Sequence, residues 1–585
     1  MKGFAGWLVE AEAASLQARP APEMYDGCSV LYRGYIANVS ALIEESKERG
    51  EALKDTSDGQ LFVKAYHWWG EKLQSRVLGE YAVAVFNKQR SSLFLTHDSL
   101  GLVPLFYSER PDGLAFASHL HDLVLLTGIQ DLDEEYIADY LATCSVISAR
   151  TPYAHIRRLL RGQSLHWINR RISVRKTWDI TTIQPIFLGS DGEYEERLRV
   201  LLREGVAAAL RSDGKVWSEL SGGLDSSSVV SVAAQSGDSR LSALSIVYSS
   251  SRSADESEWM KLVVQHYGLA WHTIDADQSR PFSELPQGFC AEPISASPAA
   301  GLCRRYQALA ESNGVRVMLT GYGGDQVFCG DSPKPFYLAD SLPFRLRHLL
   351  TALRDWQASD AAKRSMTYHF VKNVLQPFLC YWTHRSLSSP LATVPPSWIH
   401  PDYLGAMRLD KRSARQMAPR CRSVGEQYFA ERIWRSQFTA GDECTQSFEF
   451  RYPLLYRPLV EFMLAIPWEQ RLQPGQDRYL QRRALKGILP EMVRQRKDKA
   501  GPAEAELEGL RNKSPWTDLF LIRPRIVERR YVDARLWREA VNQARFGRIA
   551  SMRHFVATAT MEVWLRQLED VRGGTLQPKA TEQYY

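Results

Sequence analysis

At 585 residues, the chain exceeds what one hydrophobic core usually supports, so at least two domains are expected. Hydrophobic residues make up 44% and charged residues 24%, ordinary globular values that exclude wholesale disorder. The 73 Lys and Arg residues exceed the 67 Asp and Glu residues too little to require a nucleic-acid partner, so none is expected. The eight cysteines form no C-x-x-C pair, which argues against a zinc site and a disulfide framework. No signal segment and no apolar run of about 18 residues is found, so we expect a cytoplasmic protein without a membrane partner.

Short strands and turns dominate the first part of the chain. Strands are predicted at 30–36, 81–86, 93–97 and 114–117, with few long helical periods between them. Two antiparallel layers are the expected arrangement. The polar, strand-poor stretch 178–191 is interpreted as a linker.

The next part alternates helices with strands. A helix at 193–210 leads into a first apolar strand, and further strands follow at 241–248, 271–276 and 315–320, with helices at 256–267 and 302–312 between them. This alternation predicts a parallel sheet with right-handed crossovers. Ligands of such sheets bind beyond the carboxyl ends of the strands. From residue 331 onward the pattern is helical, aromatic and basic.

A glycine-rich turn joins the first of these strands to a helix. It reads Ser221-Gly222-Gly223-Leu224-Asp225-Ser226. Glycines let backbone amides approach an anion, and the following helix adds its free N–H groups. No G-x-x-x-x-G-K-[ST] motif is present, and an aspartate so close to phosphates implies an intervening Mg²⁺ ion. The loop resembles the PP-loop of ATP pyrophosphatases. The alternative is an ordinary Ser/Gly-rich turn between a strand and a helix, without a binding role.

A second glycine turn follows the strand at 315–320. It reads Gly321-Tyr322-Gly323-Gly324-Asp325. Because both turns follow parallel strands, Asp225 and Asp325 are predicted to meet at one sheet edge and to bind Mg²⁺ together.

Specific resemblance begins at Asp98, Gly101, Pro104, Leu105 and Tyr107, which match the glutamine amidotransferase domain of asparagine synthetase. That resemblance implies an N-terminal domain of the αββα (Ntn) type at 1–180. It also implies a parallel-sheet α/β synthetase domain of the PP-loop ATP pyrophosphatase class, with helical additions, at 190–585.

The chemistry of the first domain is expected to be lost. Lys2 stands where the family's nucleophilic cysteine would follow the initiator Met, and Cys28 is internal. The family's Asn-Gly pair, which helps to hold the oxyanion, aligns with Arg33-Gly34, and Asn38 keeps only the following family position. We therefore expect a degenerate scaffold that makes no ammonia.

Catalytic residues of the second domain are assigned by resemblance. Glu449, in the Glu449-Phe450-Arg451 block, is expected to orient or deprotonate an attacking ammonium, although a salt bridge with Arg451 is the alternative. Lys499 is assigned the role of neutralising the α phosphate, with Lys497 as the alternative. The residues placed around ATP are Leu220, Ser221, Gly222, Gly223, Asp225, Ser226, Leu244, Ser245, Gly321, Tyr322, Gly323 and Gly324.

The resemblance implies an ATP-dependent C–N ligase that adenylates a carboxylate, releases pyrophosphate and lets an amine displace AMP. Short segments near 335–340 and 395–398 resemble lasso peptide macrolactam synthetases. These enzymes close a precursor peptide on its own α-amine, and a leader-peptide protease or recognition protein is then an expected partner. A β-lactam synthetase, an ammonia-dependent asparagine synthetase and a tRNA-modifying PP-loop enzyme remain as alternatives.

Overall fold

The structure is a computed structural model of the chain. It describes residues 3–10, 14–53, 55–129, 131–251, 253–330, 334–385, 387, 395–408, 420–435, 447–497, 509–511 and 514–572.

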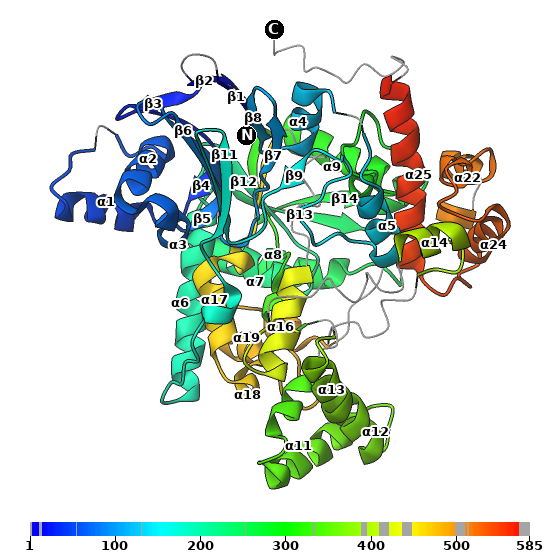
Figure 1. Cartoon of the computed structure of the whole chain (residues 1–585). Coiled ribbons are helices and arrows are strands. Elements are labelled where there is room, and N and C mark those ends of the chain that lie inside the picture. The colour runs from blue at the N-terminus through cyan, green and yellow to red at the C-terminus, as the bar shows by residue number, and fades with distance from the viewer. Residues whose placement is uncertain are drawn as a thin grey trace.

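The N-terminal part contains two antiparallel sheets packed face to face (Figure 1). One sheet has the order β2-β1-β8-β7-β9 and the other has the order β11-β10-β6-β5-β4-β3. The strands are β1 (Ala5–Glu10), β2 (Ala14–Arg19), β3 (Glu23–Tyr25), β4 (Cys28–Ile36), β5 (Gly79–Asn87), β6 (Ser92–His97), β7 (Phe106–Arg110), β8 (Gly113–Ala117), β9 (Arg157–Arg158), β10 (Gln163–Ile168) and β11 (Arg171–Lys176).

Alternation along β5 explains how the layers stack. Ala82, Ala84 and Phe86 pack between the two sheets, whereas Tyr81 and Val83 point to the opposite face, because successive strand residues face opposite sides. Helices α1 (Val39–Glu48), α2 (Asp58–Trp69) and α3 (Leu73–Arg76) share a hydrophobic core with that outer face. Helices α4 (Leu120–Thr127) and α5 (Glu134–Thr143) pack against the other sheet. The predicted αββα layering is confirmed.

A five-stranded parallel sheet forms the centre of the second part, in the order β14-β13-β12-β15-β16. Its strands are β12 (Lys215–Glu219), β13 (Leu241–Val247), β14 (Ala270–Asp275), β15 (Val315–Leu319) and β16 (Glu449–Arg451). Helices α6 (Asp191–Ala209), α7 (Leu224–Ala234) and α8 (Ser257–Tyr267) cover one face, and α9 (Ala300–Ser312) covers the other. The predicted parallel α/β class is confirmed.

The described part of the region after residue 331 is mainly helical, as predicted. It also contributes the unpredicted strand β16, whose residue Arg451 pairs with Leu319 of β15. The expected linker contains a short 3₁₀ turn (Ile180–Thr182), and the Trp178 indole donates to Glu461 at 2.8 Å. This segment is therefore packed against the second part of the chain, and the proposed boundaries at 180 and 190 stay predictions.

The C-terminal part surrounds the sheet with helices. They are α10 (Gly324–Val327), α11 (Leu346–Ser359), α12 (Met366–Phe370), α13 (Gln376–Trp382), α14 (Pro401–Met407), α16 (Val424–Arg435), α17 (Arg457–Ala465), α18 (Trp468–Arg471), α19 (Tyr479–Ala484), α20 (Glu491–Gln495), α22 (Pro515–Leu521), α23 (Arg525–Glu528), α24 (Ala534–Arg545) and α25 (Met552–Arg572). The long helix α25 packs beside α5, so the N-terminal and C-terminal parts of the chain share one core (Figure 1). None of the helices in the described ranges is both long and apolar enough to cross a bilayer.

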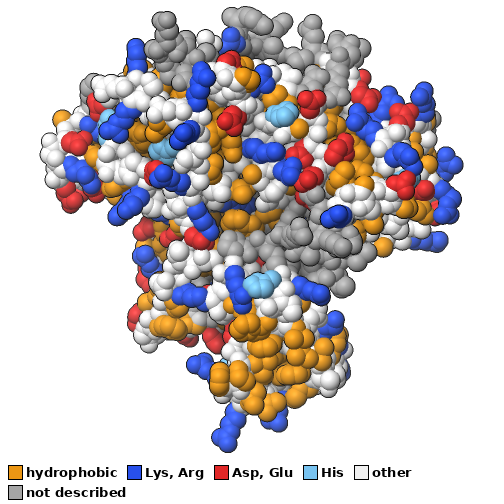
Figure 2. All heavy atoms as spheres, viewed as in Figure 1, with side chains coloured by type: hydrophobic (Ala, Val, Ile, Leu, Met, Phe, Trp, Pro, Cys, Tyr) orange, Lys and Arg blue, Asp and Glu red, His pale blue; other side chains and the backbone are white. Residues whose placement is uncertain are grey.

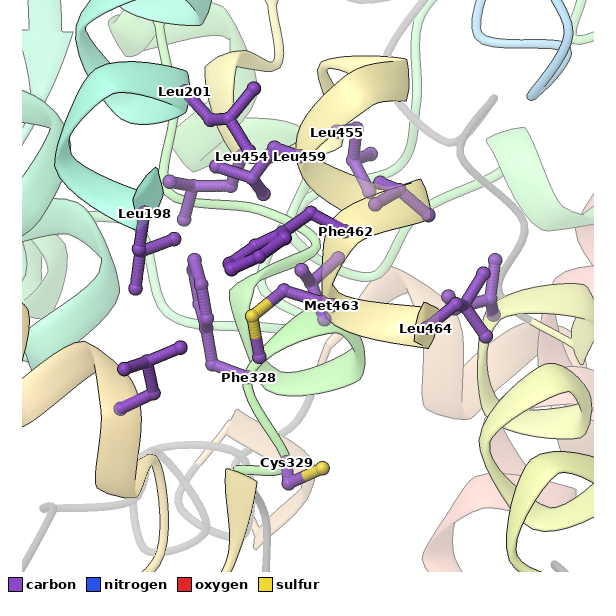
Figure 3. Packing of buried hydrophobic residues seen from close by; sticks show 14 of the residues in the cluster. Leu198, Leu201, Phe328, Cys329, Leu454, Leu455, Leu459, Phe462, Met463 and Leu464 are labelled. Atoms are coloured by element: carbon purple, nitrogen blue, oxygen red, sulfur yellow. The ribbon is translucent and has the colours of Figure 1, made fainter. Parts of the chain in front are cut away.

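The largest core lies between α6, α17 and the segment after β15. Figure 3 shows Leu198 and Leu201 of α6 around Phe328, with Leu455 and Phe462 on the other side. Close packing of this kind resists small displacements. The second glycine turn therefore rests on a rigid base.

A separate lobe of α11, α12 and α13 projects from the body (Figure 1). Figure 2 shows an apolar surface on this lobe. Phe344, two residues before α11, is 92% exposed. Leu350, Leu379 and Trp382 also lie exposed on this lobe.

Candidate functional site

The first glycine turn connects β12 to α7 as predicted. Gly222 has a φ of +72°, and a Cβ there would lie 2.7 Å from the Cβ of Trp259. A larger residue is therefore excluded by both conformation and space. The amide of Ser221 donates to the Ser226 hydroxyl at 3.1 Å, which closes the turn. Gly223 precedes α7 without a side-chain cap, so the first amides of the helix remain available to an anion.

The second turn touches the first. β12 and β15 are neighbours in the sheet, so their carboxyl ends emerge side by side. A Cβ on Gly321 would lie 2.5 Å from the backbone nitrogen of Ser226. The two turns are thus in backbone contact, and glycine is what permits it.

Asp225 and Asp325 converge on one cation, which is the guanidinium of Arg478. Arg478 Nη2 lies 2.9 Å from Asp225 Oδ2 and also contacts Asp325 Oδ1. Burial alone would lower the pKa of Arg478, but the two carboxylates raise it above its ordinary value. Sequence analysis missed Arg478, which lies just before the basic cluster that begins at Arg482.

This arrangement fits a divalent cation. One nitrogen reaches both carboxylates, so a single ion at that place would also reach both. Carboxylate oxygens are the ligands Mg²⁺ prefers. Gln481 donates to Asp225 Oδ1 at 3.1 Å, while its own Oε1 is buried and has no hydrogen-bond partner. An unsatisfied buried oxygen beside two carboxylates is consistent with an absent cation or its water.

A cleft of about 470 Å³ opens above the two turns. This volume lies within the usual range of small-molecule sites. The predicted residues that line it are Leu220, Ser221, Gly223, Asp225, Ser226, Leu244, Gly321, Tyr322, Gly323 and Asp325.

The other residues that were predicted to bind the nucleotide do not line the cleft themselves. They contact residues that do. Gly222 offers its carbonyl to Arg496 at 3.1 Å. Ser245 donates to the carbonyl of Leu220 at 2.7 Å and accepts from the Trp271 indole at 2.9 Å. Gly324 packs directly against the side chain of Asp225.

Basic residues form one wall of the cleft. Arg482 pairs with Asp477 at 2.9 Å, and Arg496 pairs with Glu256 while stacking over Trp259. Lys497 is exposed at the cleft. Lys499, the predicted catalytic lysine, lies outside the described residues.

Glu449 does not line the cleft. Its carboxylate pairs with Arg451 at 2.8 Å, and both side chains are largely buried. The Arg451 guanidinium lies 4.2 Å from the centre of the Tyr35 ring, so the pair faces the N-terminal part. The predicted role of Glu449 with the attacking ammonium stays a prediction. The alternative to that role, a salt bridge with Arg451, is present.

A second cluster that sequence analysis missed lies at the end of β12. Tyr306 of α9 donates to Glu219 at 2.9 Å, and both line the cleft. Burial raises the pKa of Glu219, and hydrogen bonds from Thr320 and Tyr306 lower it part of the way back. The available signal was a charged residue at the end of the strand, two residues before the first glycine turn begins with Ser221-Gly222.

The N-terminal part offers poor glutaminase chemistry at the positions that can be described. Cys28 is buried, which raises the pKa of its thiol, and its Sγ lies 3.5 Å from His67 Nε2. A protonated, buried thiol is a weak nucleophile. Arg33 donates to the carbonyl of Ser118 at 3.4 Å. Lys2 lies outside the described residues.

Comparisons with known proteins agree with this two-part organisation. Residues 197–566 match the family model described as asparagine synthase, and residues 10–178 match the glutamine amidotransferase domain. The chain is 23% identical to asparagine synthetase [glutamine-hydrolyzing] 3 of Bacillus subtilis, over 84% of this chain and 78% of the relative. It is 25% identical to asparagine synthetase [glutamine-hydrolyzing] 1 of the same organism, over 80% and 74%.

Proposed function

Because the chain belongs to the asparagine synthase family, and is accordingly an ATP-dependent amide-forming enzyme, we propose that its acceptor amine comes from its own peptide substrate. The reaction would join an Asp or Glu side chain of a precursor peptide to the α-amine of the same peptide. AMP and pyrophosphate would leave, and a macrolactam would remain.

The observation that carries the ATP chemistry is the convergence of Asp225 and Asp325. In this proposal the two carboxylates would hold Mg²⁺, whose positive charge would stabilise the pyrophosphate as it leaves. The amides at the start of α7 and the Ser221 and Ser226 hydroxyls bind the phosphates. Lys499, or Lys497 at the cleft, stabilises charge on the α phosphate.

The source of the amine is inferred from the N-terminal part. By resemblance, Arg33 stands at the place of the Asn that helps to hold the oxyanion, and its guanidinium donates to the Ser118 carbonyl, while Cys28 is buried. Both features disfavour ammonia production from glutamine. An amine carried by the substrate gains from proximity, an effect that can supply several kcal/mol.

The experiment combines purified protein, Mg²⁺ and ATP with two kinds of substrate. Linear peptides with a free α-amine and one Asp or Glu side chain should lose one water in mass while AMP appears. The second candidate is an ammonia-dependent asparagine synthetase, which the names of the two relatives favour. Turnover with L-aspartate and ammonium chloride, without any peptide cyclisation, would establish that candidate instead.

A partner protein that removes or recognises a leader peptide and a cytoplasmic location belong to the same proposal. No role for nucleic acid or a membrane is part of it. Co-purification of a small peptidase with the tagged protein would support the partner.

A further inference from the structure

Among the described residues, five acidic side chains line the cleft, and four of them are paired with arginine. Arg478 holds three of these acids, Asp225, Asp325 and Asp477. Arg496 holds the fourth acid, Glu256. The fifth acid is Glu219.

Glu219 is held only by neutral groups among the described residues. The Tyr306 hydroxyl donates to it at 2.9 Å, and the Thr320 hydroxyl also forms a hydrogen bond with it. Its neighbours on this face of the sheet are apolar, including Trp217 and Met318. A carboxylate in such surroundings is costly unless a cation joins it.

Its remaining exposed surface opens into the cleft, which it lines. Glu219 ends β12, directly before the first glycine turn, and Thr320 precedes the second. A cation bound to Glu219 would therefore lie next to both turns, where the activated carboxyl forms. We propose that Glu219, in place of Glu449, binds the ammonium group of the acceptor amine and takes its proton, with Tyr306 as a positioning residue. This inference rests on the proposed function, since an amine is consumed only by an activated carboxyl.

The proton transfers balance. The ammonium gives one proton to the Glu219 carboxylate and becomes a neutral amine. Its nitrogen then forms the C–N bond with the acyl carbon, the bond from that carbon to the phosphate oxygen breaks, and AMP leaves with the electron pair. The second proton of the nitrogen leaves to water in the cleft.

The electrostatic setting suits a base. Burial raises the pKa of Glu219 from its ordinary value, and the two hydrogen bonds limit the rise. A base is most effective when its pKa lies near the working pH. Tyr306 is the titratable group in contact with Glu219, and Cys303 and Tyr452 act on Tyr306 in turn.

The first test needs no substrate. Thallium(I) mimics ammonium in size and charge, so crystals soaked in thallium acetate report cation sites by anomalous scattering. We expect a peak within coordination distance of the Glu219 carboxylate, and its loss in Glu219→Gln. No peak there in the unchanged protein, or an equal peak in the variant, would overturn the inference.

The second test separates the two half-reactions with the carboxylate that supports pyrophosphate exchange, which is either a linear peptide whose α-amine is acetylated or L-aspartate. Glu219→Gln should keep pyrophosphate exchange into ATP but lose about 10²-fold or more of amide formation from ammonium. Hydroxylamine, a nucleophile largely unprotonated at neutral pH, should restore product. Glu311→Gln, an exposed change on α9, is the control. A raised KM for ATP in Glu219→Gln would mean that Glu219 binds nucleotide, and would overturn the inference.

A pH profile adds a readout that a purely structural role would not move. Amide formation should fall as the pH drops through the raised pKa of Glu219, because its carboxylate becomes protonated. Tyr306→Phe removes a hydrogen bond that lowers this pKa, so its acidic limb should move to higher pH. If the acidic limb of Tyr306→Phe lies at the same pH as that of the unchanged protein, the assignment of Glu219 as the base is contradicted. If the unchanged protein shows no exchange with any carboxylate, the proposed function fails, and the thallium result still decides the cation site.

Discussion

Gly321→Ala tests the contact between the two glycine turns. The added Cβ would lie 2.5 Å from the backbone nitrogen of Ser226 and 2.8 Å from the carbonyl carbon of Asp225. Both are backbone atoms, so neither can rotate away. The contact must lengthen to the 3.4 Å at which ordinary van der Waals distances begin. The turns must therefore separate by roughly 1 Å, which is enough to misplace groups that bind phosphate.

The expected loss of nucleotide affinity follows from the hydrogen bonds to the phosphates that would be broken. A hydrogen bond to a charged group contributes about 1.5–3 kcal/mol, so losing one weakens binding by about 10- to 100-fold. Calorimetric titration with Mg²⁺ and α,β-methylene ATP measures the dissociation constant of the nucleotide without turnover. The midpoint of thermal unfolding should change by only a few degrees, because overpacking costs about 1–3 kcal/mol.

Gly405→Ala is the matched control. It lies in α14, and its added Cβ would meet no atom within 4 Å. It should bind the nucleotide as the unchanged protein does and be stabilised slightly. Equal affinity in Gly321→Ala and Gly405→Ala would refute the argument that turn contact sets the phosphate site.

Four further outcomes are expected. Asp225→Asn should lower Mg²⁺-dependent ATP turnover by about 10²-fold or more, measured as AMP release, and unchanged turnover would remove it from the site. Of Lys497→Ala and Lys499→Ala, the one that abolishes AMP release with circular dichroism unchanged identifies the lysine at the α phosphate. Arg451→Ala should cost about 3–5 kcal/mol in the free energy of unfolding, because it leaves Glu449 buried and unpaired, and denaturant titration measures it. Added glutamine should release no glutamate in an enzymatic glutamate assay, and release would contradict the scaffold interpretation.

The glycine turns could be predicted because their information is local. A strand, two glycines, an aspartate and a helix stand within a few residues, and the rule for parallel sheets places both turns at one edge. The central strands were located to within one or two residues for the same reason. Their apolar runs are bounded by turn residues.

Other parts of the site carry no local signal. β16 has only three residues and joins β15 from more than a hundred residues away, so neither length nor alternation marks it. Arg478 is one arginine among many, and only the fold brings it to Asp225. Glu219 is a single charged residue at the end of a short strand, and its partner Tyr306 comes from a separate helix. Pairings between distant single residues depend on tertiary packing, which a pattern in one sequence does not contain.

The N-terminal part contacts the chain directly after the edge strand β16 of the parallel sheet. Beyond β16, the amide of Tyr452 donates at 2.7 Å to Glu80, which also accepts from the Tyr35 hydroxyl at 3.1 Å. Burial raises the pKa of Glu80 to about 8, so this carboxyl is held mainly protonated at neutral pH and needs no counter-charge. An N-terminal part that released no ammonia would therefore still have a structural task, because it supplies the hydrogen-bond acceptor for the chain directly after the edge strand β16. Removing residues 1–180 would leave that backbone amide without this acceptor.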